Sequence, residues 1–453
     1  MEKRRRKYTD IEIDESVKEN SRLKTENSSM QKILQSRRFR YAEKIANTFN
    51  VLVPEGTWRR RIVNGIYAPI RGFRKHKNVK WIRKIEKVVD GHEKVVVLHS
   101  IPWNTPLRQR PHHLARCLAE KGLMVIYLEP DEPIRRMRVV NDNFVTVNSW
   151  DLLFEMRKNA NSRYYFCFNN VSNIPLELVK KIQDSGYELI YEYIDEFHED
   201  ISGSLVNQLE VWKNLPKMKP TVVLASAQKL YDEAKQHFGD KSKVLMSRNA
   251  VVIEDFCYKR YEGVEVPSDL EDIRRNGKPV VGYYGALAPW LDYDLISKVA
   301  KENEQYNFVL LGVNYQNALD KLDQSIGNIY YLGPKKYADL PKYSAHFDVA
   351  IIPFMTGEIA KGTSPVKLFE YMAMGLPVVG TRDLDECRGY EYVYLADNTK
   401  EFEKFLDTAM KDKKKEAVRK KLLAQAEQNT WMQRAEDLVR ALNESDGVGK
   451  RIK

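Results

Sequence analysis

Cysteine is scarce in this sequence of 453 residues, and long apolar runs are absent. The four cysteines, Cys117, Cys167, Cys257 and Cys387, form no close pair, which excludes a zinc knuckle and argues against a disulfide scaffold. No stretch approaches the roughly 18–20 consecutive apolar residues of a membrane-spanning helix, and no apolar signal core follows the basic start. We therefore expect reduced thiols and a cytoplasmic location.

Acidic residues are too few to balance the basic ones, and the imbalance lies at one end of the chain. Lys and Arg number 74 and Asp and Glu 63, a net charge of +11 that favours a polyanionic partner. Residues 1–90 contain 24 basic and 11 acidic side chains, whereas residues 91–453 contain 50 and 52. Because this near-neutral body shows neither a basic stripe nor a known reader motif, we expect no nucleic-acid partner.

The basic front end has two overlapping parts. Residues 11–50 carry apolar side chains at helical spacing without Gly or Pro, which predicts a long exposed helix and leaves open a homo-oligomer formed through it. Residues 31–90 mix 16 basic and 4 acidic side chains with Trp, Phe and Ile. Such mixing is typical of a segment that binds an anionic membrane surface, but a solvated basic helix packed on the body explains it equally.

From residue 94 onward, apolar segments of strand length alternate with segments of helix length. With 43% hydrophobic residues the chain can fill large cores, and the alternation predicts α/β domains with doubly wound parallel sheets. The rhythm is lost over residues 254–276, so we place a domain boundary there. The expected strands are residues 94–98, 124–128, 164–168, 188–193, 221–225, 279–284, 307–311, 329–332, 348–352 and 377–380. The expected parts are a basic helical extension (1–90), two Rossmann-like domains (91–255 and 256–429), and a C-terminal helix and tail (430–453).

The most informative segment is Gly-Thr-Ser-Pro-Val-Lys-Leu-Phe-Glu-Tyr at residues 362–371. Thr363 or Ser364 can cap a helix whose first turn contains Pro365, because proline lacks an N–H that would be unpaired there. Ligands of such sheets bind beyond the carboxyl ends of the strands, in the cleft between the two domains. Helix amides and the positive end of the helix dipole, pointing into that cleft, would bind phosphate.

Two charged side chains follow on this helix. Lys367 lies in the first turn, where its charge can add to phosphate binding. Glu370 lies nearly one turn later on the same side, where it can accept hydrogen bonds from vicinal ribose hydroxyls. A plain capped helix with Lys367 and Glu370 as a solvent-exposed pair explains the same residues.

This block resembles the donor-site signature of GT-B glycosyltransferases of the family-4 kind, and the resemblance extends over about residues 94–443. In that family the helix begins beside the diphosphate of a sugar nucleotide and its glutamate holds the ribose. Glu370 matches the second of two glutamates that the family separates by seven residues, whereas the first falls on Gly362, with Glu358 a displaced substitute. The resemblance implies a GT-B fold: two facing Rossmann-like domains that bind a nucleotide sugar between them.

Three further segments are similar to the same family. Residues 247–251, Ser-Arg-Asn-Ala-Val, are similar to the segment that closes the first domain, which implies that Asn249 contacts the donor. Residues 281–286 are similar to the strand and glycine turn that open the second domain. Thr430 and Trp431 are similar to the start of the closing element, which in GT-B folds crosses back onto the first domain.

The glycine turn and the loop after it bear on phosphate binding. Gly285 and Ala286 let the backbone approach a ligand phosphate, since neither has a bulky side chain. Family-4 enzymes place Arg and Lys in the loop that follows, but here residues 287–292 read Leu-Ala-Pro-Trp-Leu-Asp. The diphosphate charge must therefore be met by lysines of segment 361–367, by helix amides or by Arg residues across the cleft.

In the first domain, residues 108–115 read Arg-Gln-Arg-Pro-His-His-Leu-Ala, between the first strand and the first helix. Cations there can bind phosphate and imidazoles can move protons, which makes Arg110 and His112 catalytic candidates. His112 and His113 at a helix start are otherwise ordinary surface or capping residues. The string resembles a subgroup of cell-surface polysaccharide glycosyltransferases that includes the teichuronic-acid type.

The third catalytic candidate is Asp195, in the acidic loop after the strand expected over residues 188–193. Just past the carboxyl end of a strand, its carboxylate can face an acceptor hydroxyl as a base. The alternative is that Asp195 holds the loop through backbone amides.

These observations predict a metal-independent hexosyltransferase without a cofactor, acting at the cytoplasmic face of the membrane. It would move a sugar from a UDP-, GDP- or dTDP-linked donor to a surface glycan or its lipid carrier. The resemblance implies retention at the anomeric carbon, whereas inversion would require a base such as Asp195. The alternatives are a catalytically silent scaffold of a polysaccharide assembly complex and a GT-B-like sugar-nucleotide epimerase.

Overall fold

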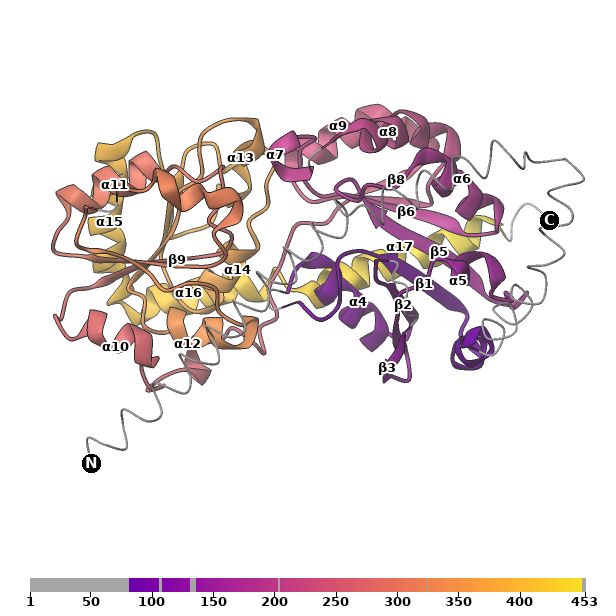
Figure 1. Cartoon of the computed structure of the whole chain (residues 1–453), viewed down its shortest axis with the longest axis horizontal. Helices are drawn as coiled ribbons and strands as arrows, with labels where there is room; N and C mark the ends of the chain where they lie inside the picture. Colours follow the sequence, from indigo (N-terminus) through magenta and orange to yellow (C-terminus); the bar gives the residue numbers. More distant parts are fainter. Residues whose placement is uncertain (1–80, 106–107, 131–135, 203, 324, 450–453) are drawn as a thin grey trace, which may run out of the picture. The chain divides into compact units, whose positions relative to one another are not determined.

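The computed structural model describes residues 81–449 apart from residues 106–107, 131–135, 203 and 324. The chain divides into two compact units, residues 1–81 and 82–453, and the description below concerns the second (Figure 1). The predicted helix over residues 11–50 and the predicted interfacial segment, up to residue 80, lie outside the described residues.

The first sheet has the strand order β3-β4-β2-β1-β5-β6-β7-β8. Neighbouring strands are parallel except β3 and β4, which pair antiparallel. The central strands are buried on both faces, as a parallel sheet covered by helices on both sides requires. The strands are β1 (Lys94–His99), β2 (Met124–Leu128), β3 (Met137–Asn141), β4 (Phe144–Val147), β5 (Arg163–Asn169), β6 (Glu188–Tyr193), β7 (Val222–Ala225) and β8 (Lys243–Met246).

Helices connect these strands in the doubly wound manner. Figure 1 shows α6 and α8 on one side of the first sheet and α4 and α17 on the other. The chain crosses from β1 to β2 through α4 and from β5 to β6 through α6, in opposite directions along the sheet. Because both crossovers are right-handed, α4 and α6 lie on opposite faces. The helices of this part are α4 (Arg110–Glu120), α5 (Asp151–Glu155), α6 (Leu176–Asp184), α7 (Glu199–Ser202), α8 (Val206–Met218) and α9 (Gln228–Phe238).

The second sheet has the order β11-β10-β9-β12-β13-β14, and all its strands are parallel. Its order is that of a six-stranded Rossmann sheet, with the reversal of direction between β9 and β12. The strands are β9 (Val280–Tyr284), β10 (Asn307–Leu311), β11 (Ile329–Tyr331), β12 (Val349–Ile352), β13 (Val378–Thr381) and β14 (Val393–Ala396). The helices are α10 (Ser268–Arg274), α11 (Tyr293–Glu302), α12 (Leu340–Ser344), α13 (Glu358–Lys361), α14 (Val366–Ala373), α15 (Thr399–Lys413), α16 (Glu416–Glu427) and α17 (Trp431–Gly449).

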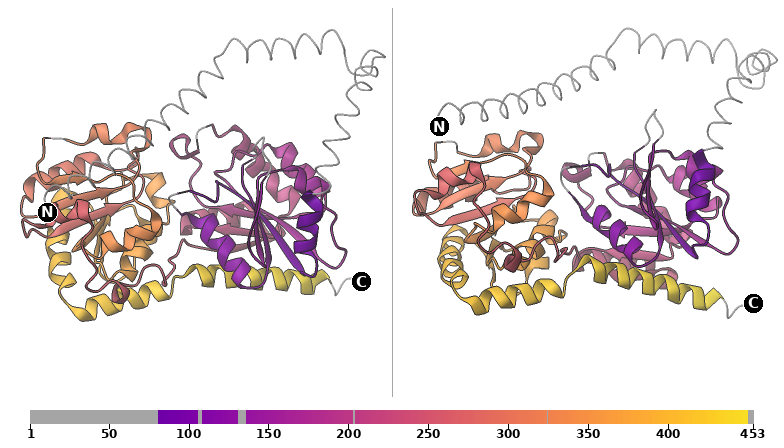
Figure 2. Two further views of the ribbon diagram at one scale, coloured as in Figure 1. Left: turned by 60° about the horizontal axis from the view of Figure 1, so that its bottom comes forward. Right: turned by 90° about the horizontal axis from the view of Figure 1, so that it is seen from below.

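The last helix, α17, packs on the first sheet although it follows the second one (Figure 2). Thr430 and Gln433 exchange hydrogen bonds between side chain and backbone at its start, a reciprocal cap. Trp431 is 1% exposed and stacks on His113 of α4, with ring centroids 5.3 Å apart. Leu438 and Leu442 lie in the same core. The apolar face of α17 therefore forms part of the hydrophobic core of the first sheet.

The predicted fold class is confirmed: the described residues form two doubly wound α/β domains whose sheets are parallel apart from the β3 and β4 pair. Each of the ten strands expected from the sequence overlaps an observed strand. The first sheet ends at Met246 and the second begins at Val280, on either side of the stretch that lacks the strand and helix rhythm.

Candidate active site

A cavity of about 400 Å³ lies at the carboxyl ends of strands from both sheets. Its walls come from the loops after β1, β6, β8, β9 and β12 and from the start of α14. The structure gathers every sequence-predicted site residue here except His112: Arg110, Asp195, Asn249, Gly285, Ala286, Thr363, Ser364, Pro365, Lys367 and Glu370. In the second sheet the cavity sits where the strand order reverses, the place at which such sheets bind ligands.

The start of α14 differs in one detail from the prediction. The prediction that Thr363 or Ser364 caps the helix is wrong, because Pro365 occupies the N-cap position and no side chain caps it. Thr363 donates instead to the carbonyl of Ile359, at 2.6 Å. Among the described residues, no group accepts a hydrogen bond from the first two helical amides, those of residues 366 and 367. The uncapped end therefore leaves donors and the positive dipole end for a ligand.

Lys367 depends on the glycine turn after β9. Gly285 has a φ of +140°, and a Cβ atom added to it would lie 2.8 Å from Cε of Lys367. The Nζ atom of Lys367 lies 5.3 Å from the ring centroid of Tyr283 and 5.2 Å from that of Phe354. Burial lowers the pKa of this ammonium to about 8, against the charge of Glu370. Lys367 is therefore a half-buried cation that is still largely charged at pH 7.

Glu370 is the buried carboxylate of the same helix. It lines the cavity and is 4% exposed. Burial raises the pKa of Glu370 to about 7, while the hydroxyl of Tyr284 and the charge of Lys367 act in the opposite direction. The solvent-exposed pair considered above is wrong, because Glu370 is buried and both side chains line the cavity.

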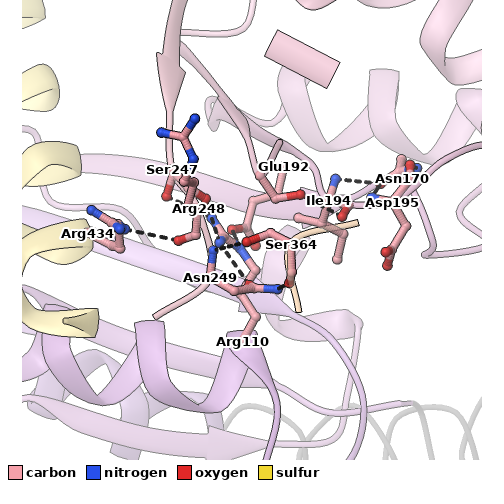
Figure 3. A network of polar contacts seen from close by, with 11 residues as sticks. Arg110, Asn170, Glu192, Ile194, Asp195, Ser247, Arg248, Asn249, Ser364 and Arg434 are labelled. Carbon is pink, nitrogen blue, oxygen red and sulfur yellow. Dashed lines mark hydrogen bonds and ion pairs between the residues drawn. The ribbon is translucent and has the colours of Figure 1, made fainter. Parts of the chain in front are cut away.

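Arg110 is the centre of a buried polar network (Figure 3). Its Nε donates to Oε1 of Glu192 at 2.8 Å, and the two side chains are 4% and 1% exposed. Its two Nη atoms donate to the carbonyl and hydroxyl oxygens of Ser247, at 2.8 and 2.9 Å. Nη1 also reaches Oδ1 of Asn249 at 3.3 Å. With its donors so committed, Arg110 orients Asn249 more directly than it could bind a phosphate.

Asn249 carries this network to the second domain. Its Nδ2 donates to the carbonyl of Ser364 at 2.6 Å, and its backbone N–H donates to the hydroxyl of Ser364 at 3.1 Å. The series Glu192, Arg110, Asn249 and Ser364 therefore links strand β6 to the residues just before α14, as Figure 3 shows.

His112 lies outside the cavity. Its Nδ1 accepts a hydrogen bond from the backbone of Gln109 at 3.1 Å, so Nε2 carries the proton and donates to the carbonyl of Pro102, also at 3.1 Å. The ring stacks on Tyr127, and burial lowers the pKa of the imidazole. His112 is thus a neutral side chain that holds the loop after β1, which agrees with the capping alternative.

Asp195 lines the cavity from the loop after β6. Asn170 holds that loop: its Nδ2 donates to the carbonyl of Asp195 at 2.7 Å, and its Oδ1 accepts from the backbone of Ile194 at 2.9 Å. The carboxyl group of Asp195 accepts no hydrogen bond from the described residues (Figure 3). Burial raises its pKa to about 7, and the charge of Arg110 opposes that rise. Since Asn170 fixes the loop, the Asp195 carboxylate is available to a ligand.

Gly362 lies against a carboxylate of the first domain. A Cβ atom added to Gly362 would lie 2.5 Å from Oε1 of Glu196. Lys229 of α9 pairs with Glu196 and, at 2.8 Å, with Glu358 of α13. Glu358 also pairs with Lys361 at 3.0 Å, and these two lysines lower its pKa to about 2. The displaced substitute Glu358 is therefore an exposed, paired side chain, whereas Glu196 fills the space beside Gly362.

Sequence reasoning left out several residues of the cavity wall, among them Tyr284, Tyr337 and Leu340. It also left out Glu192, the buried partner of Arg110. The one available signal for Glu192 was a carboxylate between two tyrosines near the end of the strand Glu-Leu-Ile-Tyr-Glu-Tyr. Tyr337 lies in a short turn whose sequence contains no comparable signal.

Two kinds of feature are absent from the described part of the chain, membrane-spanning helices and clusters of metal ligands. No helix there is both long and apolar enough to cross a membrane. No group of three or more His, Cys, Asp or Glu side chains there is placed to hold a metal ion.

The second domain is similar to a known family. Residues 278–412 match the family described as Glycosyl transferases group 1. A curated protein named as a teichuronic acid biosynthesis glycosyltransferase, TuaH of Bacillus subtilis (strain 168), is 29% identical over 121 residues. That alignment covers 25% of this chain and 30% of the relative, so the similarity spans less than a third of the relative's length.

Solved structures are similar over most of the chain. The sucrose-phosphate synthase of Thermosynechococcus elongatus superposes with a TM-score of 0.57 at 12% identity, covering 78% of this chain and 100% of its own. The α,α-trehalose 6-phosphate synthase of Burkholderia multivorans gives 0.59 at 10% identity, with coverages of 79% and 99%. HepE of Anabaena, in complex with UDP and glucose, gives 0.53 at 17% identity, with coverages of 78% and 100%. The described residues thus have a GT-B fold, and residues 278–412 within it are similar to the glycosyl transferases group 1 family.

Proposed function

We propose that this protein is a glycosyltransferase that moves a sugar from a nucleoside diphosphate donor to a glycan acceptor. The observation that carries the proposal is the cavity, in which an uncapped helix start, a half-buried Lys367 and a buried Glu370 meet at the reversal point of a domain that matches the group 1 family. Helix amides and the Lys367 ammonium suit a diphosphate, and the Glu370 carboxylate suits the vicinal hydroxyls of a ribose.

The donor is proposed to be a UDP-sugar in the first instance. Solved structures of similar fold include HepE in complex with UDP-glucose and a trehalose-6-phosphate enzyme bound with UDP-2-fluoro glucose. The site has the parts that any nucleoside diphosphate sugar needs, so GDP- and dTDP-sugars belong in the same test.

The acceptor is proposed to be a cell-surface polysaccharide precursor or a lipid-linked glycan at the cytoplasmic face of the membrane. Support comes from the name of the Bacillus subtilis relative and from the basic, aromatic composition of residues 31–90. A truncation to test membrane binding should end before residue 81, since Ile82, Ile85 and Val89 are buried and belong to the second unit. Loss of binding to anionic liposomes on removing residues 1–80 supports the assignment, and retained binding contradicts it.

Asp195 is proposed as the base if the reaction inverts the anomeric carbon. In that case the bond from C1 to the diphosphate oxygen breaks with its electron pair on the diphosphate, the acceptor oxygen bonds to C1, and the acceptor proton goes to the Asp195 carboxylate. A retaining reaction by front-face attack needs no such base. The anomeric configuration of the product decides between the two.

Thermal unfolding with a panel of UDP-, GDP- and dTDP-sugars tests the proposal. A ligand at 100 times its Kd stabilises the folded state by about 2.7 kcal/mol, which raises the unfolding temperature. Glu370→Ala should abolish the rise, while Glu427→Ala, at an exposed carboxylate on α16, should leave it intact. No rise with any donor overturns the proposal. Donor binding without transfer to any acceptor favours the silent scaffold, and interconversion of sugar nucleotides without an acceptor favours the epimerase.

A further inference from the structure

The cationic side chains around the cavity are few. Among the described residues that line it, the basic ones are Arg108, Arg110 and Lys367. The guanidinium of Arg110 is committed to Glu192, and loop 287–292 of the second domain contributes no basic residue. A diphosphate carries more negative charge than Lys367 alone can balance, so Arg108 is the cation left to consider.

Arg108 is held at the cavity by the residues that follow it. Gln109 and His112 form a reciprocal cap at the start of α4, which fixes the backbone just after Arg108. The guanidinium carbon lies 5.1 Å from the ring centroid of Trp103. Stacking of this kind orients the guanidinium without using its N–H donors. No described residue accepts a hydrogen bond from it or forms an ion pair with it.

The charge of Arg108 acts toward the second domain. Tyr337 lines the same cavity from that domain, and the positive charge of Arg108 opposes the rise that burial causes in the pKa of its phenol. Arg108 has the same opposing effect on the pKa of Asp255, in the segment that connects the two sheets. Arg108 and the first residues of α14 line the same cavity, so the guanidinium lies on the wall of the space that these residues enclose.

We propose that Arg108, from the first domain, binds the diphosphate of the donor and balances the negative charge that develops as the sugar departs. This inference rests on the proposed function. The bond from C1 to the diphosphate oxygen breaks with its electron pair on that oxygen, and Arg108 stays protonated throughout, so it supplies charge and N–H donors but no proton. A guanidinium suits this task because its planar donors match phosphate oxygens two at a time.

Isothermal titration with UDP and with uridine tests the inference on Arg108→Gln, Arg108→Lys and a matched control. The control is Arg116→Gln, at an exposed arginine on α4 that pairs with Glu120 and does not line the cavity. Arg108→Gln should weaken UDP binding by about 10- to 100-fold, because a hydrogen bond to a charged group is lost, and should leave uridine binding unchanged. Arg108→Lys should recover part of the loss, and Arg116→Gln should bind UDP as the wild type does.

Three further readouts separate a direct contact from a structural effect. The unfolding temperature without ligand should change little in Arg108→Gln, since the stacking on Trp103 is the one described contact of the guanidinium that is lost. UDP affinity should depend less on salt in the variant. In the transferase assay kcat should fall together with kcat/KM, because the charge develops in the transition state. If Arg108→Gln binds UDP as tightly as the wild type does, the role of Arg108 is overturned and the proposed function stands. If the wild type binds none of UDP, GDP and dTDP, the proposed function is overturned as well.

Discussion

Replacing Arg110 by Met tests whether this guanidinium has a structural or a chemical role. Arg110 and Glu192 are 4% and 1% exposed, and the substitution would leave the Glu192 carboxylate buried without its partner. It also removes the donors that the two oxygens of Ser247 and Oδ1 of Asn249 accept from. Removing one member of a buried ion pair typically costs about 3–5 kcal/mol, so we expect Arg110→Met to lower the free energy of unfolding by that amount.

Urea unfolding of three further variants completes this test. In Arg110→Met/Glu192→Leu both charges are gone, so most of the loss should be recovered and the two substitutions should be strongly non-additive. Arg116→Met breaks the exposed pair with Glu120, a change worth at most about 1 kcal/mol. Glu192→Leu alone leaves Arg110 buried and unpaired, and should cost as much as Arg110→Met. If Arg110→Met is no more destabilising than Arg116→Met, the structural role is refuted and Arg110 becomes available as a ligand for phosphate.

Three other predictions follow from the cavity residues. With Asp195 as the base, kcat/KM should rise with pH through about 7, the pKa of its carboxyl group. Asp195→Asn should lower kcat/KM about 100-fold or more and abolish that rise. A rise that survives in the variant identifies Glu370 as the titrating group. Because burial raises the pKa of Glu370 to about 7, its contribution to stability is fully present below its unfolded pKa of 4.5 and is lost as pH rises through 7. Glu370→Gln should therefore match the wild type in thermal stability near pH 4 and exceed it by on the order of 1 kcal/mol near pH 8. Equal stability of the two proteins at both pH values contradicts the raised pKa of Glu370. Gly362→Glu should destabilise the fold by about 1–3 kcal/mol, since its Cβ would lie 2.5 Å from Oε1 of Glu196. Adding Glu196→Gly should restore stability. A single variant as stable as the wild type would show that the Glu196 side chain moves aside freely.

The central strands and the donor-side helix could be predicted from the sequence because their signals are local. Strands β2, β6 and β10 were expected at their observed bounds, since each is a run of apolar residues buried on both faces. The strands missed are β3, β4, β8 and β14, and three of them, β3, β8 and β14, are edge strands. In β3 four of five residues are exposed, so apolar periodicity is too weak to mark it as a strand.

The roles of individual polar residues depended on pairings that no local pattern encodes. Arg110 and His112 are two residues apart, yet Arg110 faces Glu192, which is 82 positions away, and His112 faces the carbonyl of Pro102. The capping prediction for α14 failed because Asn249, distant in sequence, binds both the hydroxyl and the carbonyl of Ser364. Proximity in the motif correctly indicated that Arg110 and Ser364 line the cavity but wrongly placed His112 there, because only tertiary contacts distinguish a ligand-binding side chain from one that holds a loop.

The two departures of this chain from the family pattern have a common physical interpretation. The second domain lacks the carboxylate at Gly362 and the cations of loop 287–292. At the first position the carboxylate of Glu196 stands against the glycine, and at the second the guanidinium of Arg108 lines the shared cavity. Both side chains come from the first domain and have the sign of the missing charge. Charge acts through distance and burial rather than through chain position, so in the proposed donor site Arg108 can replace the cations of loop 287–292 from the opposite wall, whereas Glu196 is paired with Lys229 and does not line the cavity.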